Sequence, residues 1–168
     1  VMLNVKQVGE RLYVSAMPTK ASHFDAIAAR GITHVVSLEQ RVDVTGFSQR
    51  GIVVFERFAP DHTPLRVPFL AEVADTIHQE LTAGHCLLIH DRGGRTRSCT
   101  AVAAYYVKLG WQPKKALRKA AKVVPSFRES IKAYQLDRKI QQLFEHYYPE
   151  AAPPEGFLTR FLNKLRFG

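Results

Sequence analysis

One segment of the sequence has residue types and spacing suited to holding an anion. Residues 89–98 read IHDRGGRTRS, a Gly-rich loop between an apolar run and a helical pattern. The N–H groups of such a loop can converge on one anion, and a helix N-terminus adds its dipole. Glycine permits the positive φ angles of a tight loop, and an arginine on the first helical turn can clamp two phosphate oxygens. The sequence therefore predicts a phosphate-binding loop that contains His90, Arg92, Gly93, Gly94, Arg95, Thr96 and Arg97.

The charge of the chain also indicates an anionic ligand. Lys and Arg number 24 against 15 Asp and Glu, which gives a formal net charge of +9. No acidic residue lies between Asp91 and Glu129, although this stretch is rich in Lys and Arg. Such a field attracts phosphate esters, anionic lipid or nucleic acid, whereas a solvated helix face would explain the lysines equally well. Nucleic acid is not expected, because aromatic residues are not interleaved for base stacking.

The elements that must position the loop alternate between strands and helices. Short apolar, β-branched runs predict strands at residues 11–15, 32–38, 52–58 and 86–90. Helical spacing and capping signals predict helices at residues 23–30, 67–81, 97–110, from 113 onward, and 130–147. This order is typical of an α/β domain with a central, mostly parallel sheet flanked by helices. We expect residues 1–150 to form this single domain.

The remaining residues, 151–168, are expected to be a linker and a basic amphipathic helix. Residues 149–156 read PEAAPPEG, and the apolar residues of GFLTRFLNKLRFG (156–168) fall on one helical face. That helix could lie on an anionic membrane surface or pack back onto the domain, and packing is favoured. No apolar run is long enough to span a membrane, and no signal-peptide pattern is present. With two cysteines and no disulfide framework, a cytoplasmic location is the expectation.

These segments resemble the cysteine-dependent protein tyrosine and dual-specificity phosphatases. In that family a buried strand leads to His-Cys, five residues, Arg, and then Ser or Thr; His90, Arg97 and Ser98 match this pattern. Residues 59–64 (APDHTP) look like the family's general-acid segment. The resemblance runs from residue 11 to about residue 148 and implies a dual-specificity-phosphatase-like fold. It also implies hydrolysis of phosphate monoesters with neither a cofactor nor a metal.

The resemblance assigns a role to each matching residue. Asp61 would be the general acid and base, unless it only caps a turn. Arg97 would hold the phosphoryl oxygens, and Ser98 would hydrogen-bond the nucleophilic sulfur. His90 would shape the loop through hydrogen bonds.

Asp91 occupies the position of the family's nucleophilic cysteine. Neither cysteine can replace it, because Cys86 is roughly 16 Å away along an extended strand and Cys99 is expected to point into the core. We expect the Asp91 carboxylate to accept hydrogen bonds from the loop N–H groups and from Arg97, and so to fill the phosphate site itself. The chain should therefore have little activity. A natural and an introduced aspartate would both have this effect.

Three functions fit the sequence. The first is a tyrosine or dual-specificity phosphatase that Asp91 inactivates. The second is an inositol-phosphate or lipid-phosphate phosphatase, because Arg92 and Arg95 add cations beside the loop and resemble the basic loops of inositol-lipid and mitochondrial phosphatidylglycerophosphate phosphatases. The third is a non-catalytic pseudophosphatase that binds phosphorylated partners.

Overall fold

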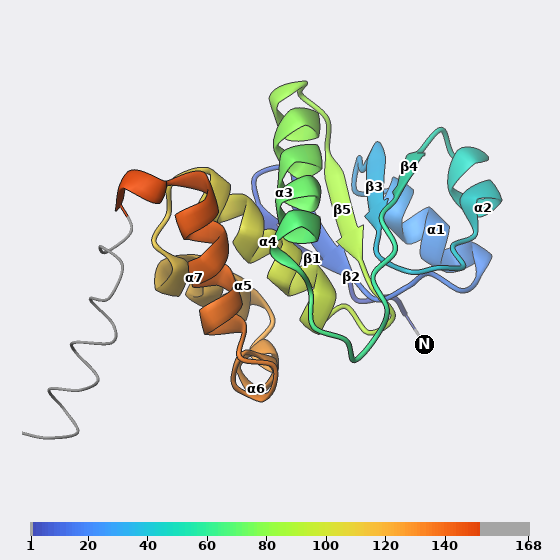
Figure 1. Cartoon of the computed structure of the whole chain (residues 1–168). Helices are drawn as coiled ribbons and strands as arrows, with labels where there is room; N and C mark the ends of the chain where they lie inside the picture. Colours follow the sequence, from blue (N-terminus) through green and yellow to red (C-terminus); the bar gives the residue numbers. More distant parts are fainter. Residues whose placement is uncertain (1, 152–168) are drawn as a thin grey trace, which may run out of the picture.

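The computed structural model describes residues 2–151 as one α/β domain with a five-stranded sheet in the order β1-β2-β5-β3-β4 (Figure 1). The strands are β1 (Lys6–Gly9), β2 (Leu12–Ser15), β3 (His34–Ser37), β4 (Val53–Glu56) and β5 (Leu87–His90). The helices are α1 (Ala21–Ala28), α2 (Val44–Ser48), α3 (Val67–Thr82), α4 (Thr96–Lys108), α5 (Pro113–Val123), α6 (Phe127–Ala133) and α7 (Leu136–Tyr147), followed by a 3-10 turn at Pro149–Ala151.

Strand β5 lies at the centre of the sheet and carries the chain toward the predicted loop. It pairs in parallel with β2 and β3, and its last residue, His90, is in register with Ser15 and Ser37. Only β1, at one edge, runs antiparallel. The carboxyl ends of β2, β3 and β5 therefore meet at one edge of the sheet, where open α/β sheets bind their ligands.

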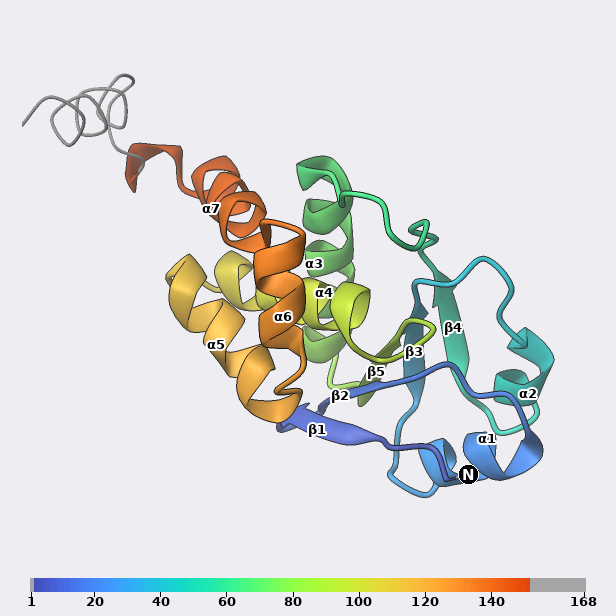
Figure 2. The same cartoon turned by 90° about the horizontal axis from the view of Figure 1, so that it is seen from below.

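The two faces of the sheet pack against different helices. Alternate β5 residues point to opposite faces, so Leu87 and Ile89 join the larger core while Leu88 joins the smaller one. The larger core includes residues of α3, α4, α5 and α7, and the smaller one includes residues of α1 and α2. Figures 1 and 2 show these two helical layers on either side of the sheet. The fold class predicted from the sequence is confirmed.

Three details of the predicted elements are wrong. The helix expected at 130–147 is two helices, α6 and α7, because Gln135 adopts a left-handed φ of 50° between them. Strand β1 and the short helix α2 were not expected. The predicted helix at 156–168 lies outside the described residues. Among the described residues, no helix is both long and apolar enough to cross a membrane.

Candidate active site

The loop between β5 and α4, residues 91–95, is held tightly against the end of β2. Gly94 has a φ of +67°, and a Cβ on it would lie 2.5 Å from the backbone N of Ala16 and the backbone C of Ser15. Met17 N–H donates to the carbonyl of Arg92 at 3.3 Å. A residue with a side chain would therefore clash with fixed backbone at position 94, which explains the glycine.

The carboxylate of Asp91 sits inside the ring of backbone amides that this loop forms. Its Oδ1 accepts from the N–H of Gly94 and from that of Arg95 at 3.2 Å. Its Oδ2 accepts from the N–H groups of Arg97 and Ser98 at 2.9 and 3.2 Å. The residue is only 2% exposed. The expected hydrogen bonds from the loop N–H groups are thus present.

The guanidinium of Arg97 is engaged elsewhere, contrary to the expectation that it would bond Asp91. Its Nη1 donates to the carbonyls of Ala59 at 2.7 Å and Leu38 at 3.2 Å, and its Nη2 lies 2.5 Å from Glu39 Oε1. The only bond from Arg97 to Asp91 recorded among the described residues is that of its backbone N–H. The acceptors that follow β3 and β4 already hold the side chain, so its orientation is fixed before any ligand arrives.

Sequence reasoning missed Glu39, which is buried and pairs with Arg97. A signal for it exists in the printed sequence. Glu39 directly follows the apolar run ITHVVSL, so it comes at the end of a predicted buried strand. An acid at the carboxyl end of a parallel strand is brought to the same sheet edge as the loop after β5.

Asp61 lies close to Arg97, at the mouth of the site. Its Oδ1 is 3.5 Å from Arg97 Nη2 and also accepts from the N–H of His62 at 3.1 Å. The Asp61 side chain is 38% exposed, so it can reach solvent and a ligand. His62 has a φ of 56° and its Nδ1 lies 3.1 Å from the hydroxyl of Tyr134. The structure therefore places Asp61, from the segment 59–64, beside Arg97, which follows the Gly-rich loop.

His90 is fully buried directly before the loop. Among the described residues, neither of its ring nitrogens has a partner of ordinary hydrogen-bond geometry, although the backbone of Asp91 is close enough to act on the ring as a weak hydrogen-bond partner. Burial lowers its pKa from 6.5 to about 4, so the ring is neutral, and it stacks on Phe47 at 6.2 Å. His90 is thus a buried, neutral residue beside the loop, and its role in shaping the loop stays a prediction.

Ser98 and the two cysteines have clear positions. Ser98 is fully buried, and its Oγ has no hydrogen-bond partner among the described residues. Cys99 is also fully buried, and burial raises its pKa to about 12, so it cannot supply a thiolate. Cys86 lies just before β5, and burial raises its pKa as well. Neither thiol can replace a nucleophile in the loop.

A cavity of about 530 Å³ opens over the loop. Arg92 and Arg95 are exposed at its edge, and Lys6 and Lys139 add two cations that the sequence analysis did not identify. Thr96 lines the cavity too, but its hydroxyl bonds Ser130 of α6 at 2.7 Å and so anchors the loop. The remaining lining residues are Asn4, Asp61, His62, Thr63, Pro64, Leu65, Asp91, Gly93, Gly94, Arg97, Val124, Ser126, Tyr134 and Leu136.

The family model described as PTP-SAK, Swiss Army Knife protein, DSP-PTPase phosphatase domain, matches residues 7–146. The chain belongs to this family. Within residues 2–151, the match covers the strands except the first residue of β1, the helices α1 to α7 except the last residue of α7, and the lining of the cavity apart from Asn4 and Lys6. No curated protein matches the chain.

Solved phosphatase structures share the fold of this domain. Tk-PTP in its active form is 27% identical with a TM-score of 0.73, over 84% of this chain and 96% of that one. Human DUSP28 is 18% identical with a TM-score of 0.69, over 88% and 100% of the two chains. PTPMT1 in complex with PI(5)P is 20% identical with a TM-score of 0.63, over 82% and 97%. The phosphatase domain therefore spans nearly the whole length of each.

Proposed function

We propose that this phosphatase domain is built to bind and hydrolyse phosphate monoesters, and that Asp91 in the nucleophile position leaves the chain inactive as given. One observation carries the proposal. Four backbone N–H groups, those of residues 94, 95, 97 and 98, converge on the Asp91 carboxylate. A ring of amides at a helix N-terminus favours a phosphoryl group for the same electrostatic reasons that it favours this carboxylate.

The bonds of Asp91 explain why it is a poor nucleophile. A carboxylate can attack phosphorus, but both oxygens of Asp91 are already hydrogen-bonded by the ring of amides. The phosphoryl group would have to occupy the same ring, and it would meet a resident negative charge there. A thiolate presents one atom to phosphorus and leaves the amides free for the phosphoryl oxygens.

The other residues fit the steps of phosphoryl transfer. Arg97, held by Glu39 and two carbonyls, would bind two phosphoryl oxygens as charge builds in the transition state. Asp61 would protonate the leaving oxygen and then activate water. The buried Ser98 hydroxyl, which has no partner of ordinary hydrogen-bond geometry among the described residues and only a weak contact with Cys99, would be available to hydrogen-bond a sulfur at position 91.

The decisive experiment restores a thiol. Asp91→Cys should turn over an aryl phosphate at least a hundredfold faster than the chain as given. Asp91→Ala is the matched control, because it frees the amides without providing a nucleophile and should stay inactive. A turnover by the original chain within about tenfold of Asp91→Cys would contradict the assignment of Asp91. An inactive Asp91→Cys that still binds phosphate tightly would instead support a non-catalytic module for phosphorylated partners.

Asp61 can be tested in the same background. Adding Asp61→Asn to Asp91→Cys should slow hydrolysis by about 10²- to 10⁴-fold for a phosphotyrosine peptide, whose leaving oxygen needs a proton. The loss should be much smaller for a substrate with an acidic leaving group. Equal rates with and without the change on the peptide would remove Asp61 from the mechanism.

A second candidate function is hydrolysis of substrates with more than one phosphate, such as inositol phosphates or lipid headgroups. Four cations at the cavity favour this candidate: Lys6, Arg92, Arg95 and Lys139. Arg97 is held inside the site by Glu39, so these four side chains are the ones available to attract a second phosphate. The likeness to PTPMT1 concerns the fold alone, so this candidate rests on the charges of the cavity. Assaying Asp91→Cys on an inositol bisphosphate and on a phosphotyrosine peptide separates the two candidates.

A further inference from the structure

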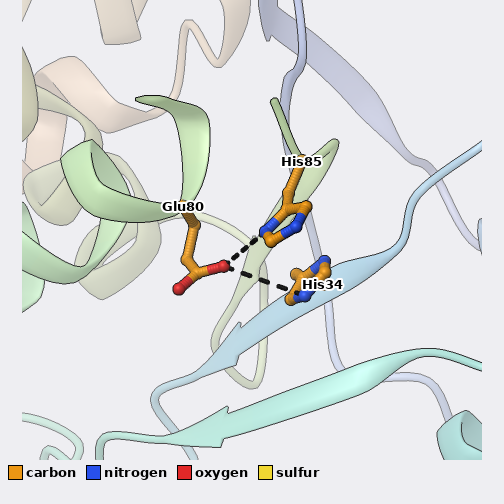
Figure 3. A group of neighbouring side chains, drawn as sticks. All are labelled: His34, Glu80 and His85. Atoms are coloured by element: carbon orange, nitrogen blue, oxygen red, sulfur yellow. Dashed lines mark hydrogen bonds and ion pairs between the residues drawn. The ribbon is translucent and has the colours of Figure 1, made fainter. Parts of the chain in front are cut away.

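Two histidines and a glutamate converge at the end of the sheet that is opposite to the cavity. His34 is the first residue of β3, Glu80 lies in the last turn of α3, and His85 lies between α3 and β5. His34 is in register with Leu87 at the start of β5, whereas Asp91 follows the end of that strand. Figure 3 shows the three side chains pointing toward one another. This cluster has no part in the proposed phosphatase chemistry.

The distances between the polar atoms are close to those of ligands that share one ion. Glu80 Oε2 lies 2.6 Å from His85 Nδ1 and 3.8 Å from His34 Nε2. Ligand atoms about 2.0–2.1 Å from a tetrahedral ion are about 3.3 Å apart, between these two values. The side chains of His34 and Glu80 are only 15% and 12% exposed, so they cannot turn freely into solvent.

A neighbouring hydroxyl can act as the hydrogen-bond partner of one ring nitrogen of His34. Thr33 Oγ1 lies 2.8 Å from His34 Nδ1 and 3.3 Å from the carbonyl of Cys86, and it accepts from the N–H of Cys86 at 3.2 Å. In the tautomer with its proton on Nδ1, His34 donates to Thr33, and the lone pair on Nε2 faces the carboxylate of Glu80.

In that tautomer two acceptors, His34 Nε2 and Glu80 Oε2, face each other across 3.8 Å, a geometry that a cation would satisfy. The third group, His85 Nδ1, contributes a hydrogen bond to the same carboxylate oxygen and becomes a ligand when its proton leaves. The rings of His34 and His85 stack at 3.7 Å, and one ligand atom from each of the three residues lies within 4.8 Å of the other two. A metal-bound histidine usually donates a hydrogen bond from its second ring nitrogen, and Thr33 Oγ1 would accept such a bond from His34 Nδ1.

We propose that His34, Glu80 and His85 form a binding site for a divalent transition-metal ion, with Zn²⁺ the preferred ion. Two imidazoles and a carboxylate are a donor set that suits Zn²⁺, with a water in the fourth position. When a neutral His85 binds the ion through Nδ1, its proton moves through solvent to Nε2, so the imidazole stays neutral and no net proton is released.

The backbone around the cluster is already held in place. Arg11 donates to the carbonyl of Leu81 at 2.9 Å and to that of His85 at 3.5 Å, which fixes the turn between α3 and β5. Phe55 of β4 stacks on His34 at 6.1 Å. A bound ion would tie the end of α3 to the starts of β3 and β5, so its role is to stabilise the domain.

The test uses the full chain freed of metal with a chelator. Zn²⁺ added alone should bind with a stoichiometry of one in calorimetry, and it should raise the melting temperature by on the order of 5 °C at about 100-fold excess over the Kd. Co²⁺ at the same site should give the visible absorption of a tetrahedral centre. Glu80→Gln, which keeps a hydrogen-bond acceptor for His85, and His85→Ala should each weaken Zn²⁺ binding by more than about 100-fold. Thr33→Val should weaken it by about 10- to 100-fold.

The matched control is His78→Ala, which removes another histidine of α3 that lies outside the cluster. It should leave the affinity and the melting shift unchanged. Absence of saturable Zn²⁺ binding, or equal affinity in Glu80→Gln, His85→Ala and His78→Ala, would overturn the proposal. Because these measurements do not involve Asp91 or turnover, their outcome is independent of the proposed function.

Discussion

At the scale of single residues, Asp91 competes with any anion that the loop would bind. Two unit charges about 4 Å apart interact by about 4 kcal/mol at an effective dielectric near 20, and movement of the carboxylate offsets part of this. We therefore expect Asp91→Ala to bind inorganic phosphate at least tenfold more tightly than the original chain, measured by calorimetric titration at equal ionic strength. Asp137→Ala, which changes the net charge equally outside the cavity, should have little effect. Tighter binding by the original chain would rule out self-inhibition.

The pair of Arg97 and Glu39 makes a different prediction, because both side chains are buried, at 5% and 8% exposure. Removing Glu39 leaves the buried guanidinium with the partly exposed Asp61, 3.5 Å from Nη2, as its remaining ion-pair partner among the described residues, so Glu39→Ala should lower the free energy of unfolding by up to about 3–5 kcal/mol in urea denaturation. Asp25→Ala breaks the ion pair with Arg50, in which the aspartate is 66% exposed, and should cost at most about 1 kcal/mol. Equal losses of unfolding free energy in the two variants would show that the buried ion pair stabilises the domain no more than the exposed one.

His90 should make the stability of the domain depend on pH. Burial lowers its pKa to about 4, so between about pH 6.5 and pH 4 the unfolded state binds a proton that the native state does not. The free energy of unfolding therefore falls as pH falls through this window, by about 2 kcal/mol between about pH 7 and about pH 5. Urea denaturation of His90→Gln should lack this part of the pH dependence, whereas His146→Gln, at an exposed position, should keep it. An unchanged slope in His90→Gln would contradict the assignment.

At the scale of elements, the β5–α4 loop offers two adjacent glycines with opposite requirements. A Cβ at position 94 would meet the backbone of Ser15 and Ala16 at a positive φ, whereas a Cβ at Gly93 would have no heavy atom within 4 Å. In the Asp91→Cys background, Gly94→Ala should reduce kcat/KM for an aryl phosphate by at least about 100-fold, because the ring of amides would distort. Gly93→Ala should stay within about threefold of the parent. Comparable losses at both positions would mean that the close approach to β2 does not maintain the loop.

The loop and its flanking elements could be predicted because several local signals agree there. The run before Asp91 is apolar, the glycines are adjacent, and Arg97 begins a clear helical pattern. The elements that were missed carry weak or conflicting local signals. Helix α2 has five residues, one of them Gly46, and its apolar Phe47 is explained by packing in the smaller core, against Phe24 of α1 at 4.9 Å and His90 at 6.2 Å. The break at Gln135 has no Gly or Pro to mark it.

The residues of the candidate site could likewise be predicted where the sequence carries a local signal. Asp61, Arg97 and the loop belong to sequence motifs, so they could be predicted to lie together once the fold was inferred. Glu39 pairs with Arg97 across 58 positions of sequence, and Lys6 and Lys139 reach the cavity from β1 and α7. The position of Glu39 after a predicted strand places it at the correct edge of the sheet, but its pairing with Arg97 and the approach of the two lysines depend on the strand order and on the packing of α7.

At the scale of the whole molecule, the excess of positive charge is partly gathered where it could select substrates. Lys6 comes from the antiparallel edge of the sheet and Lys139 from the last long helix, yet both line the cavity. Cations at the edge of a cleft attract substrates that carry further phosphates beyond the one held in the loop. In the Asp91→Cys background, we therefore expect the double variant Lys6→Met and Lys139→Met to raise the KM for an inositol bisphosphate by about tenfold at low ionic strength.

The KM for an aryl monophosphate should change by less than about threefold in the same double variant, because Arg97 and the ring of amides hold the single phosphate. The kcat should be unaffected for both substrates, since neither lysine reaches the reacting atoms in this arrangement. Lys114→Met, on the exposed side of α5 and away from the cavity, is the charge-matched control for each single change. Equal rises in KM for the two substrates would show that the lysines attract any anion, and would count against a substrate with more than one phosphate.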